Sequence, residues 1–441
     1  MVATSDKDQI TELQRFSAAQ ARIELDQKNI SSEELVKACL DRIELREKDL
    51  NAWTFIDPDL AISQARKLDN ELKRSEIHGI PIGIKDIYDT CDMPTAYGTS
   101  FMKNHKPSRD SNWVSILRSA GAVLIGKTKT TEFANAFPTT TRNPHNLSRS
   151  PGASSSGSAA AVADFMVPLA IGSQTGGSII RPAAYCGVYG YKPSIEGLPK
   201  GNVRHAKPSI DTPGIFSRSI KDISVLRSVS MNDSSRVSTI SKINSLRLGL
   251  CRTEHWDHAM PETKEIIKET TEILSKHGIS LQNIQLPDEL SEAMEEFSVI
   301  VTLEDARAIS KDCAEQFERL NPWSQRVLKE ANEFSSNRYQ NAKKLAERAR
   351  DKINHIFENI DFIITPATRG EAPLDIESVE PSYFNSVWTL MHLPCISLPA
   401  FTGPNGMPLG LQIVGPVNDD SRLLTAAKAI ENVINNHNYP T

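Results

Sequence analysis

Three polar side chains are of the types that can cleave an amide bond, and each lies in a segment that could hold it in place. Lys85 comes at the end of a short apolar run, Ser154 lies in a serine-rich segment, and Ser178 directly follows Gly176 and Gly177. Amide cleavage requires a nucleophile, a base, hydrogen-bond donors for the oxyanion and a proton for the leaving nitrogen. Serine hydroxyls and a neutral lysine amine can supply the nucleophile and the base.

The glycines before Ser178 predict a turn in which the backbone can approach a ligand closely. Glycine has no Cβ and readily adopts φ > 0, and successive free N–H groups can form an anion-binding concavity. The turn at 172–178 could therefore hold an oxyanion, and it also suits an ordinary tight turn. In the second segment, four serines fall within the five positions 154–158, whereas one helix N-cap needs a single serine.

Lys85 has two interpretations. As a side chain at the end of a predicted strand it could be solvated, or it could form a salt bridge with Asp86. If it is buried instead, desolvation lowers its pKa and makes a neutral amine available as a base near pH 7.

Short apolar runs alternate with helical patterns along the chain, which predicts an α/β fold. Strands are expected at 78–86, 122–125, 167–171, 362–366 and 411–415, and helices at 9–26, 35–43, 113–119, 158–163, 323–357 and 421–432. We expect a single domain over residues 1–441, with a helical N-terminal region at about 1–50 and a helical insertion at about 262–360.

The composition is that of an ordinary globular protein and argues against several classes of function. The formal net charge is −5 and there is no dense lysine and arginine block, so a nucleic-acid partner is not expected. The six cysteines contain no CxxC pair and 254–258 lacks metal-site spacing, so we expect neither a metal nor a cofactor. The polar N-terminus and the lack of a long apolar stretch predict a cytoplasmic protein without a membrane span.

The two serine-bearing segments, 151–163 and 172–187, resemble the signature of the amidase signature family of serine amidohydrolases. The run 79–86 resembles that family's lysine strand. Further matches lie at 126–128, 132–133, 211–214 and 408–415. The resemblance covers roughly residues 30–435. It implies an α/β fold in which a mixed central sheet is covered on both faces by helices.

The resemblance also implies roles for individual residues. Ser178 aligns with the acylating nucleophile, Ser154 with a serine that follows a cis peptide bond and relays the proton, and Lys85 with the base. The oxyanion-hole backbone is implied to come from Thr175, Gly176, Gly177 and Ser178 itself. Ser155 aligns with a supporting serine near the lysine, and we group it with the candidate substrate-binding residues.

The chain departs from the usual family pattern around the nucleophile. Position 153 is alanine and position 156 is serine where glycine is usual, and Gln174 replaces a common aspartate. Arginine stands three residues after the nucleophile, as Arg181, with Ile180 in the more usual place. This pattern resembles the malonamidase and carboxybiuret-hydrolase branch, which implies that Arg181, with Gln174 nearby, binds a substrate carboxylate. The alternative is a structural arginine paired with an internal carboxylate.

These features predict hydrolysis of a small, carboxylate-bearing amide through an acyl-enzyme, with release of ammonia or an amine. Two other functions stay open: an amidotransferase component of a tRNA-dependent complex, which shares the triad, and a non-catalytic member of the fold. The position of Arg181 argues against the first, and the retention of all three triad residues argues against the second. The predicted partner is a small-molecule amide, and a homodimer is possible.

Overall fold

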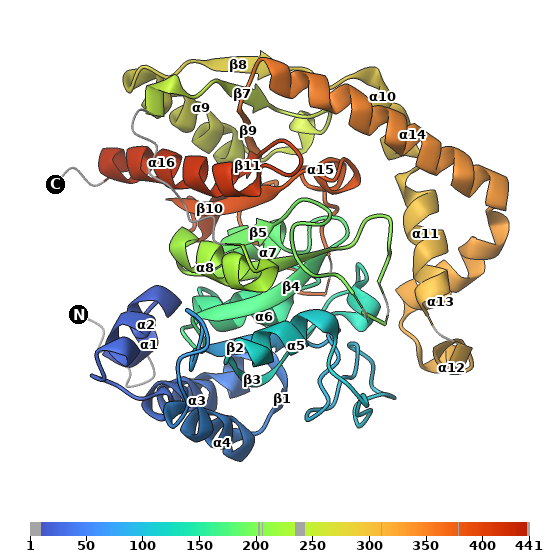
Figure 1. The fold of residues 1–441 in the computed structure, drawn as a ribbon. Helices are drawn as coiled ribbons and strands as arrows, with labels where there is room; N and C mark the ends of the chain where they lie inside the picture. The colour runs from blue at the N-terminus through green and yellow to red at the C-terminus, as the bar shows by residue number, and fades with distance from the viewer. Residues whose placement is uncertain are drawn as a thin grey trace.

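A single eleven-stranded sheet runs through the middle of the molecule (Figure 1). The computed structural model describes residues 10–438 except 202, 205, 234–242, 310 and 378. The strands are β1 Trp53–Ile56, β2 Pro81–Lys85, β3 Val123–Thr128, β4 Leu169–Gln174, β5 Tyr189–Lys192, β6 Thr212–Ser217, β7 Leu248–Cys251, β8 Leu281–Ile284, β9 Phe362–Pro366, β10 Cys395–Thr402 and β11 Pro408–Val414. Their order across the sheet is β1-β3-β2-β4-β6-β5-β10-β11-β9-β7-β8.

The sheet is mixed, with a parallel group towards each end and antiparallel strands between them. β2 pairs in parallel with both β3 and β4, and β7 pairs in parallel with both β8 and β9. The central strands β6, β5, β10 and β11 pair antiparallel. Because neighbouring parallel strands end at the same edge, the ends of β2 and β4 bring Lys85 close to the segment that precedes Ser178.

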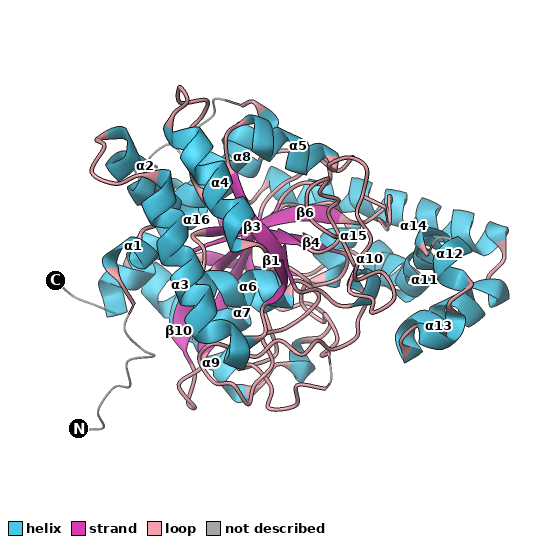
Figure 2. Cartoon of the chain, turned by 90° about the horizontal axis from the view of Figure 1, so that it is seen from below, coloured by secondary structure: helices cyan, strands magenta, loops and turns pink. Residues whose placement is uncertain are grey.

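Helices cover both faces of this sheet, as Figure 2 shows from a second direction. They are α1 Glu12–Arg15, α2 Ala18–Asp26, α3 Ser32–Leu50, α4 Pro58–Asp69, α5 Asn112–Ser119, α6 Ser156–Ala163, α7 Ile180–Cys186, α8 Ile220–Met231, α9 Pro261–Lys276, α10 Asp288–Glu295, α11 Phe297–Ala308, α12 Lys311–Ala314, α13 Pro322–Glu330, α14 Ser336–Asn354, α15 Ser386–Leu390 and α16 Asp420–Asn438. This arrangement confirms the predicted α/β class and the mixed sheet between two helical layers.

Alternation along the strands explains why two layers are needed. In β4, Leu169 and Ile171 enter the core that contains α5, α8, α9 and α16, whereas Ala170 enters the opposite core with α3, α4, α6 and α7. Successive side chains of a strand point to opposite faces. A strand that is apolar on both faces must therefore be covered on both sides.

The N-terminal helix that the sequence predicted over 9–26 is two helices. α1 ends at Arg15, and Ser17 starts α2 with its own capping box, in which its hydroxyl accepts from the N–H of Gln20. A second capping box starts a separate helix, so the apolar spacing continues while the first helix does not. Residue 9 lies outside the described residues.

The region 262–360 is mostly helical, and it also contains a strand. β8, Leu281–Ile284, pairs in parallel with β7 at the edge of the sheet. The helices that follow, α10 to α14, extend to one side of the sheet at the right of Figure 1. The predicted helix at 323–357 is divided into α13 and α14, with Ser335 capping α14.

Two further properties bear on the site. Strand β4 continues to Gln174, so three residues of the predicted turn at 172–178 are strand. In the described part of the chain, none of the helices combines the length and apolar content needed to cross a membrane.

Candidate active site

Lys85 is the last residue of β2, and its side chain is completely buried among hydroxyl groups. Its Nζ lies 2.9 Å from the Oγ atoms of Ser154, Ser155 and Ser173, and 3.5 Å from the carbonyl oxygen of Ser173. These partners come from the start of α6 and from β4. The structure thus brings together Lys85 and Ser154, two residues of the predicted triad.

The electrostatic setting favours the neutral amine of Lys85. Burial lowers its pKa well below the usual range, with Asp211 acting to raise the pKa and Lys207 to lower it. Among the described residues no carboxylate lies within ion-pair distance of its Nζ, and the expected alternative partner, Asp86, is paired elsewhere. An uncompensated buried amine of this kind suits a base.

Ser154 and Ser155 lie where the chain enters α6. The Ala153–Ser154 peptide bond is cis, and the carbonyl oxygen of Ser154 accepts from Thr130 at 3.2 Å. Ser155 occupies the N-cap position of α6 but makes no capping hydrogen bond. Its hydroxyl instead contacts Lys85 and donates to the carbonyl of Ser173 at 3.2 Å. Helix capping therefore does not account for this serine.

Ser178 lies between the end of β4 and the start of α7, at the edge of a cavity of about 490 Å³. Thr175, Gly176, Gly177 and Arg181 line the same cavity. A Cβ added to Gly177 would lie 2.6 Å from Oδ1 of Asn385, so this turn requires a residue without a side chain. The predicted nucleophile and oxyanion backbone therefore share one solvent-accessible hollow.

Gln174 supports the turn from below. Its side-chain oxygen accepts from the N–H groups of Ile179 and Ile180, at 2.8 and 3.0 Å, and its amide nitrogen donates to Thr389 at 3.0 Å. The residue is almost completely buried and is not among those that line the cavity. Its contacts orient the N-terminus of α7, so its geometry fits positioning more directly than substrate contact.

Arg181 lines the cavity one turn after Ser178, although its side chain is largely buried. Its guanidinium donates to the carbonyl of Ala153 at 2.8 Å, to Ser382 at 3.3 Å and to the carbonyl of Glu380. Its Nε has no hydrogen-bond partner, and within the described residues no carboxylate pairs with the guanidinium. The hydrogen bonds that hold the side chain thus go to neutral acceptors, and the Glu380 carboxylate acts on its charge without an ion pair among the described residues.

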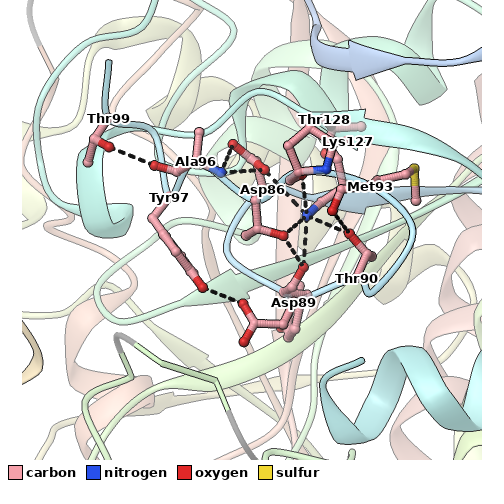
Figure 3. Close-up of polar contacts among 12 residues, drawn as sticks. Asp86, Asp89, Thr90, Met93, Ala96, Tyr97, Thr99, Lys127 and Thr128 are labelled. Carbon is pink, nitrogen blue, oxygen red and sulfur yellow. Dashed lines mark hydrogen bonds and ion pairs between the residues drawn. The ribbon is translucent and has the colours of Figure 1, made fainter. Parts of the chain in front are cut away.

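Asp86, the neighbour of Lys85, pairs with Lys127 on β3 (Figure 3). The two charged groups lie 3.4 Å apart and are completely buried. Asp86 also accepts from the N–H of Ala96 at 3.2 Å, and Lys127 donates to Thr95 at 2.6 Å. This pair fastens the loop after β2 to β3, directly behind Lys85.

A second polar network, which the sequence did not indicate, reaches the turn from the other side. Thr175 donates to Asp211 at 2.5 Å, and the backbone N–H of Lys207 donates to the same carboxylate at 2.8 Å. The ammonium of Lys207 pairs with Asp305 of α11 at 2.6 Å. Asp211 lies in a segment that resembles a family motif. No sequence pattern around Lys207 or Asp305 predicts that these two side chains form an ion pair.

Among the described residues, side chains of the types that bind metals come together in one cluster. Cys91, Asp92 and Asp110 lie close enough to share an ion. Arg118, however, pairs with both carboxylates at 2.9 Å. Both carboxylates are already engaged by one arginine, so we assign no metal to this cluster.

The chain thus combines an α/β fold, a lysine buried among serine hydroxyls, and a serine, Ser178, that lines an open cavity. The family model described as Amidase matches residues 34–424. The chain therefore belongs to the amidase family, whose reaction is hydrolysis of an amide bond.

Individual relatives are distant but cover nearly the whole chain. The chain is 28% identical to a glutamyl-tRNA(Gln) amidotransferase subunit of Clostridium acetobutylicum, over 95% of this chain and 99% of the relative. A solved amidase crystal structure superimposes with a TM-score of 0.86 at 26% identity, covering 94% of this chain and 99% of that one. A chain from a vestigial protein complex linked to the evolutionary origins of an s-triazine catabolic enzyme gives a TM-score of 0.84 at 25% identity, covering 95% and 98%.

Proposed function

We propose that this protein hydrolyses the carbon–nitrogen bond of a carboxylate-bearing amide, with Ser178 as nucleophile, Ser154 as proton relay and Lys85 as base. The observation that carries the proposal is the buried Nζ of Lys85, 2.9 Å from the hydroxyl of Ser154 and without a carboxylate partner among the described residues. A neutral amine hydrogen-bonded to a serine can accept that serine's proton.

The reaction then has two halves. Ser154 passes its proton to the neutral amine of Lys85 and takes the proton of Ser178, whose Oγ forms a bond to the amide carbon. The carbonyl oxygen becomes negative and is stabilised by N–H groups of the turn 175–178. Hydrogen-bond donors fixed around a developing negative charge lower the energy of the transition state. The carbon–nitrogen bond breaks as the proton returns from Lys85 through Ser154 to the leaving nitrogen. Water then loses a proton along the same route and attacks the acyl carbon. The bond to the Oγ of Ser178 breaks as that proton returns to the Oγ, and the acid is released.

The carboxylate preference rests on Arg181. Arg181 lines the cavity, and among the residues described the hydrogen bonds of its guanidinium go to neutral acceptors. A guanidinium binds a carboxylate in a planar, two-pronged geometry and keeps its charge when buried. The resemblance of the 178–187 segment to the malonamidase and carboxybiuret-hydrolase branch supports the same substrate class.

The test is ammonia release from small amides that differ only in a free carboxylate, such as succinamate and butyramide. We expect wild type to prefer succinamate and Ser178→Ala to be inactive. Arg181→Met should raise KM for succinamate by at least tenfold and leave KM for butyramide nearly unchanged. Equal use of both amides by wild type would remove the carboxylate assignment, and an active Ser178→Ala would remove the triad.

The relatives named as amidotransferase subunits favour a second function, transfer of ammonia within a complex. In that case the chain would copurify with partner proteins from its native cell and would release ammonia from glutamine only in their presence. Hydrolysis of succinamate by the isolated chain excludes this alternative as the main function. A non-catalytic role would be indicated if Ser178 failed to react with a fluorophosphonate probe.

A further inference from the structure

The cavity beside Ser178 has two chemically different sides. One side carries the turn 175–178 and Arg181 of α7, while another is formed by α11 and α13 and presents Phe297, Val301 and Trp323. We propose that the substrate carries, besides its carboxylate, an aryl or branched alkyl group that packs on these three side chains. This inference rests on the proposed amide hydrolysis and extends it to the substrate class.

The size of the cavity is the first argument. Its volume is about 490 Å³, and at about 30 Å³ for a water-sized group it holds roughly 16 such groups. A minimal carboxylate amide, with about half that number of non-hydrogen atoms, would leave much of the hollow filled with water. A substrate with an additional apolar group would fill more of this volume.

Helix geometry supplies the second argument. The side of the cavity formed by α11 and α13, here called the wall, consists of one face of each of these two helices. Phe297, Val301 and Asp305 follow one another at four-residue spacing on α11, and Trp323 and Arg326 stand three apart on α13. Side chains at these spacings share a helix face. The apolar members lie towards the start of α11, whereas its far end carries the Asp305 carboxylate.

The charges on the wall are already occupied, which leaves the apolar surface as its free feature. Asp305 pairs with Lys207 at 2.6 Å. The guanidinium of Arg326 lies over the ring of Trp323, 4.2 Å from its centroid, and also pairs with Glu330 at 3.5 Å. Phe297, Val301 and Trp323 are only partly buried. Covering such side chains with a ligand removes apolar surface from water, which favours binding.

The wall is also fixed relative to the catalytic turn. The N–H of Asn321, at the start of α13, donates to Glu132 at 3.0 Å. On α11, Glu304 accepts from the hydroxyl of Tyr339 at 2.8 Å and from the N–H of Ser209 at 3.0 Å. A surface anchored to both neighbouring loops does not need to form when the substrate arrives, so little ordering opposes binding.

The experiment compares kcat/KM for succinamate, N-benzylsuccinamate and 2-benzylsuccinamate, which place the ring on neither side, on the amine side or on the acyl side of the amide. We expect one benzyl compound to be preferred over succinamate by at least tenfold, the range that one apolar group gives in a hydrophobic pocket. In Trp323→Ala this preference should fall about tenfold. Val301→Asn provides a second variant of the wall.

The matched control is Trp256→Ala, which removes an indole that lies beneath Arg252 and does not line this cavity. It should keep both the rate and the benzyl preference. The inference is overturned if wild type prefers succinamate to both benzyl compounds, or if neither wall variant changes the preference. If wild type hydrolysed none of the three amides, that result would instead count against the proposed function itself.

Discussion

Asp86 and Lys127 form a completely buried ion pair, with Oδ1 and Nζ 3.4 Å apart, at the end of the strand that carries Lys85. Burial alone would raise the pKa of Asp86 and lower the pKa of Lys127. Each therefore depends on the other for its charge. The sequence offered Asp86 as a partner for Lys85, and its pairing with Lys127 leaves Lys85 to the serines.

The first prediction concerns this pair. Lys127→Met should lower the free energy of unfolding by roughly 3–5 kcal/mol, because it leaves a buried carboxylate uncompensated. The double variant Asp86→Asn/Lys127→Met should recover a large part of that loss. Urea denaturation measures both, and Arg338→Met, which breaks the exposed pair with Glu296, should change little. If the double variant is no more stable than Lys127→Met, the penalty does not come from the unpaired carboxylate.

The second prediction follows from the lowered pKa of Lys85. Between its folded pKa and its unfolded pKa of about 10.4, the unfolded chain binds one more proton than the folded chain, so stability rises with pH in this window. Lys85→Met lacks this contribution. From pH 7 to pH 9 the unfolding free energy of wild type should therefore rise relative to that of Lys85→Met, by up to about 1.4 kcal/mol per pH unit.

Urea titrations at both pH values measure this difference, with the exposed Lys268→Met as control. Parallel pH dependence in wild type and Lys85→Met would mean that Lys85 is charged in the folded protein. In that event it could not serve as the base without first losing a proton.

The sequence predicts those parts of the fold in which local pattern and final environment agree. β2, β3, β4, β9 and β11 lie in the interior of the sheet and contain short apolar runs, and all were expected. β8 was missed, and its four residues are only partly buried at the sheet edge. β1, β5, β6, β7 and β10 were missed as well, so burial in the sheet was not enough to reveal a strand. The break between α1 and α2 was missed because the apolar spacing continues across Ser17. In the structure Ser17 is the N-cap of a new helix.

The site shows the same division between local and distant signals. The segments around Ser154 and Ser178 carry long motifs, so their approach to Lys85 could be expected from the family resemblance. The contact of Lys207 with Asp305 could not, because the two residues lie on a loop and on α11 with no motif in common. The hydrogen bonds of Gln174 to the start of α7 could not be predicted from the sequence either. They go to backbone N–H groups whose direction depends on the conformation of the turn.

The third prediction uses the two charges that act on Lys85 from a distance. Asp211 raises its pKa and Lys207 lowers it. If the reaction needs neutral Lys85, kcat/KM rises with pH through that pKa, because this quantity reports the free enzyme. Asp211→Asn should move the acid limb of the profile to lower pH, and Lys207→Met should move it to higher pH. Shifts in the same direction would contradict the electrostatic assignment, whatever their effect on the maximal rate.

The fourth prediction concerns Gln174, whose oxygen holds the first N–H groups of α7. Gln174→Leu leaves the N–H groups of Ile179 and Ile180 without this acceptor, so the unfolding free energy should fall by about 1–3 kcal/mol. Because the same turn orients Ser178, kcat should fall more than KM rises. Gln174→Glu retains an oxygen and should recover most of kcat, whereas the exposed Gln27→Leu should change neither quantity. A Gln174→Leu protein whose loss lies entirely in KM would show that Gln174 acts on substrate binding and not on the position of the nucleophile.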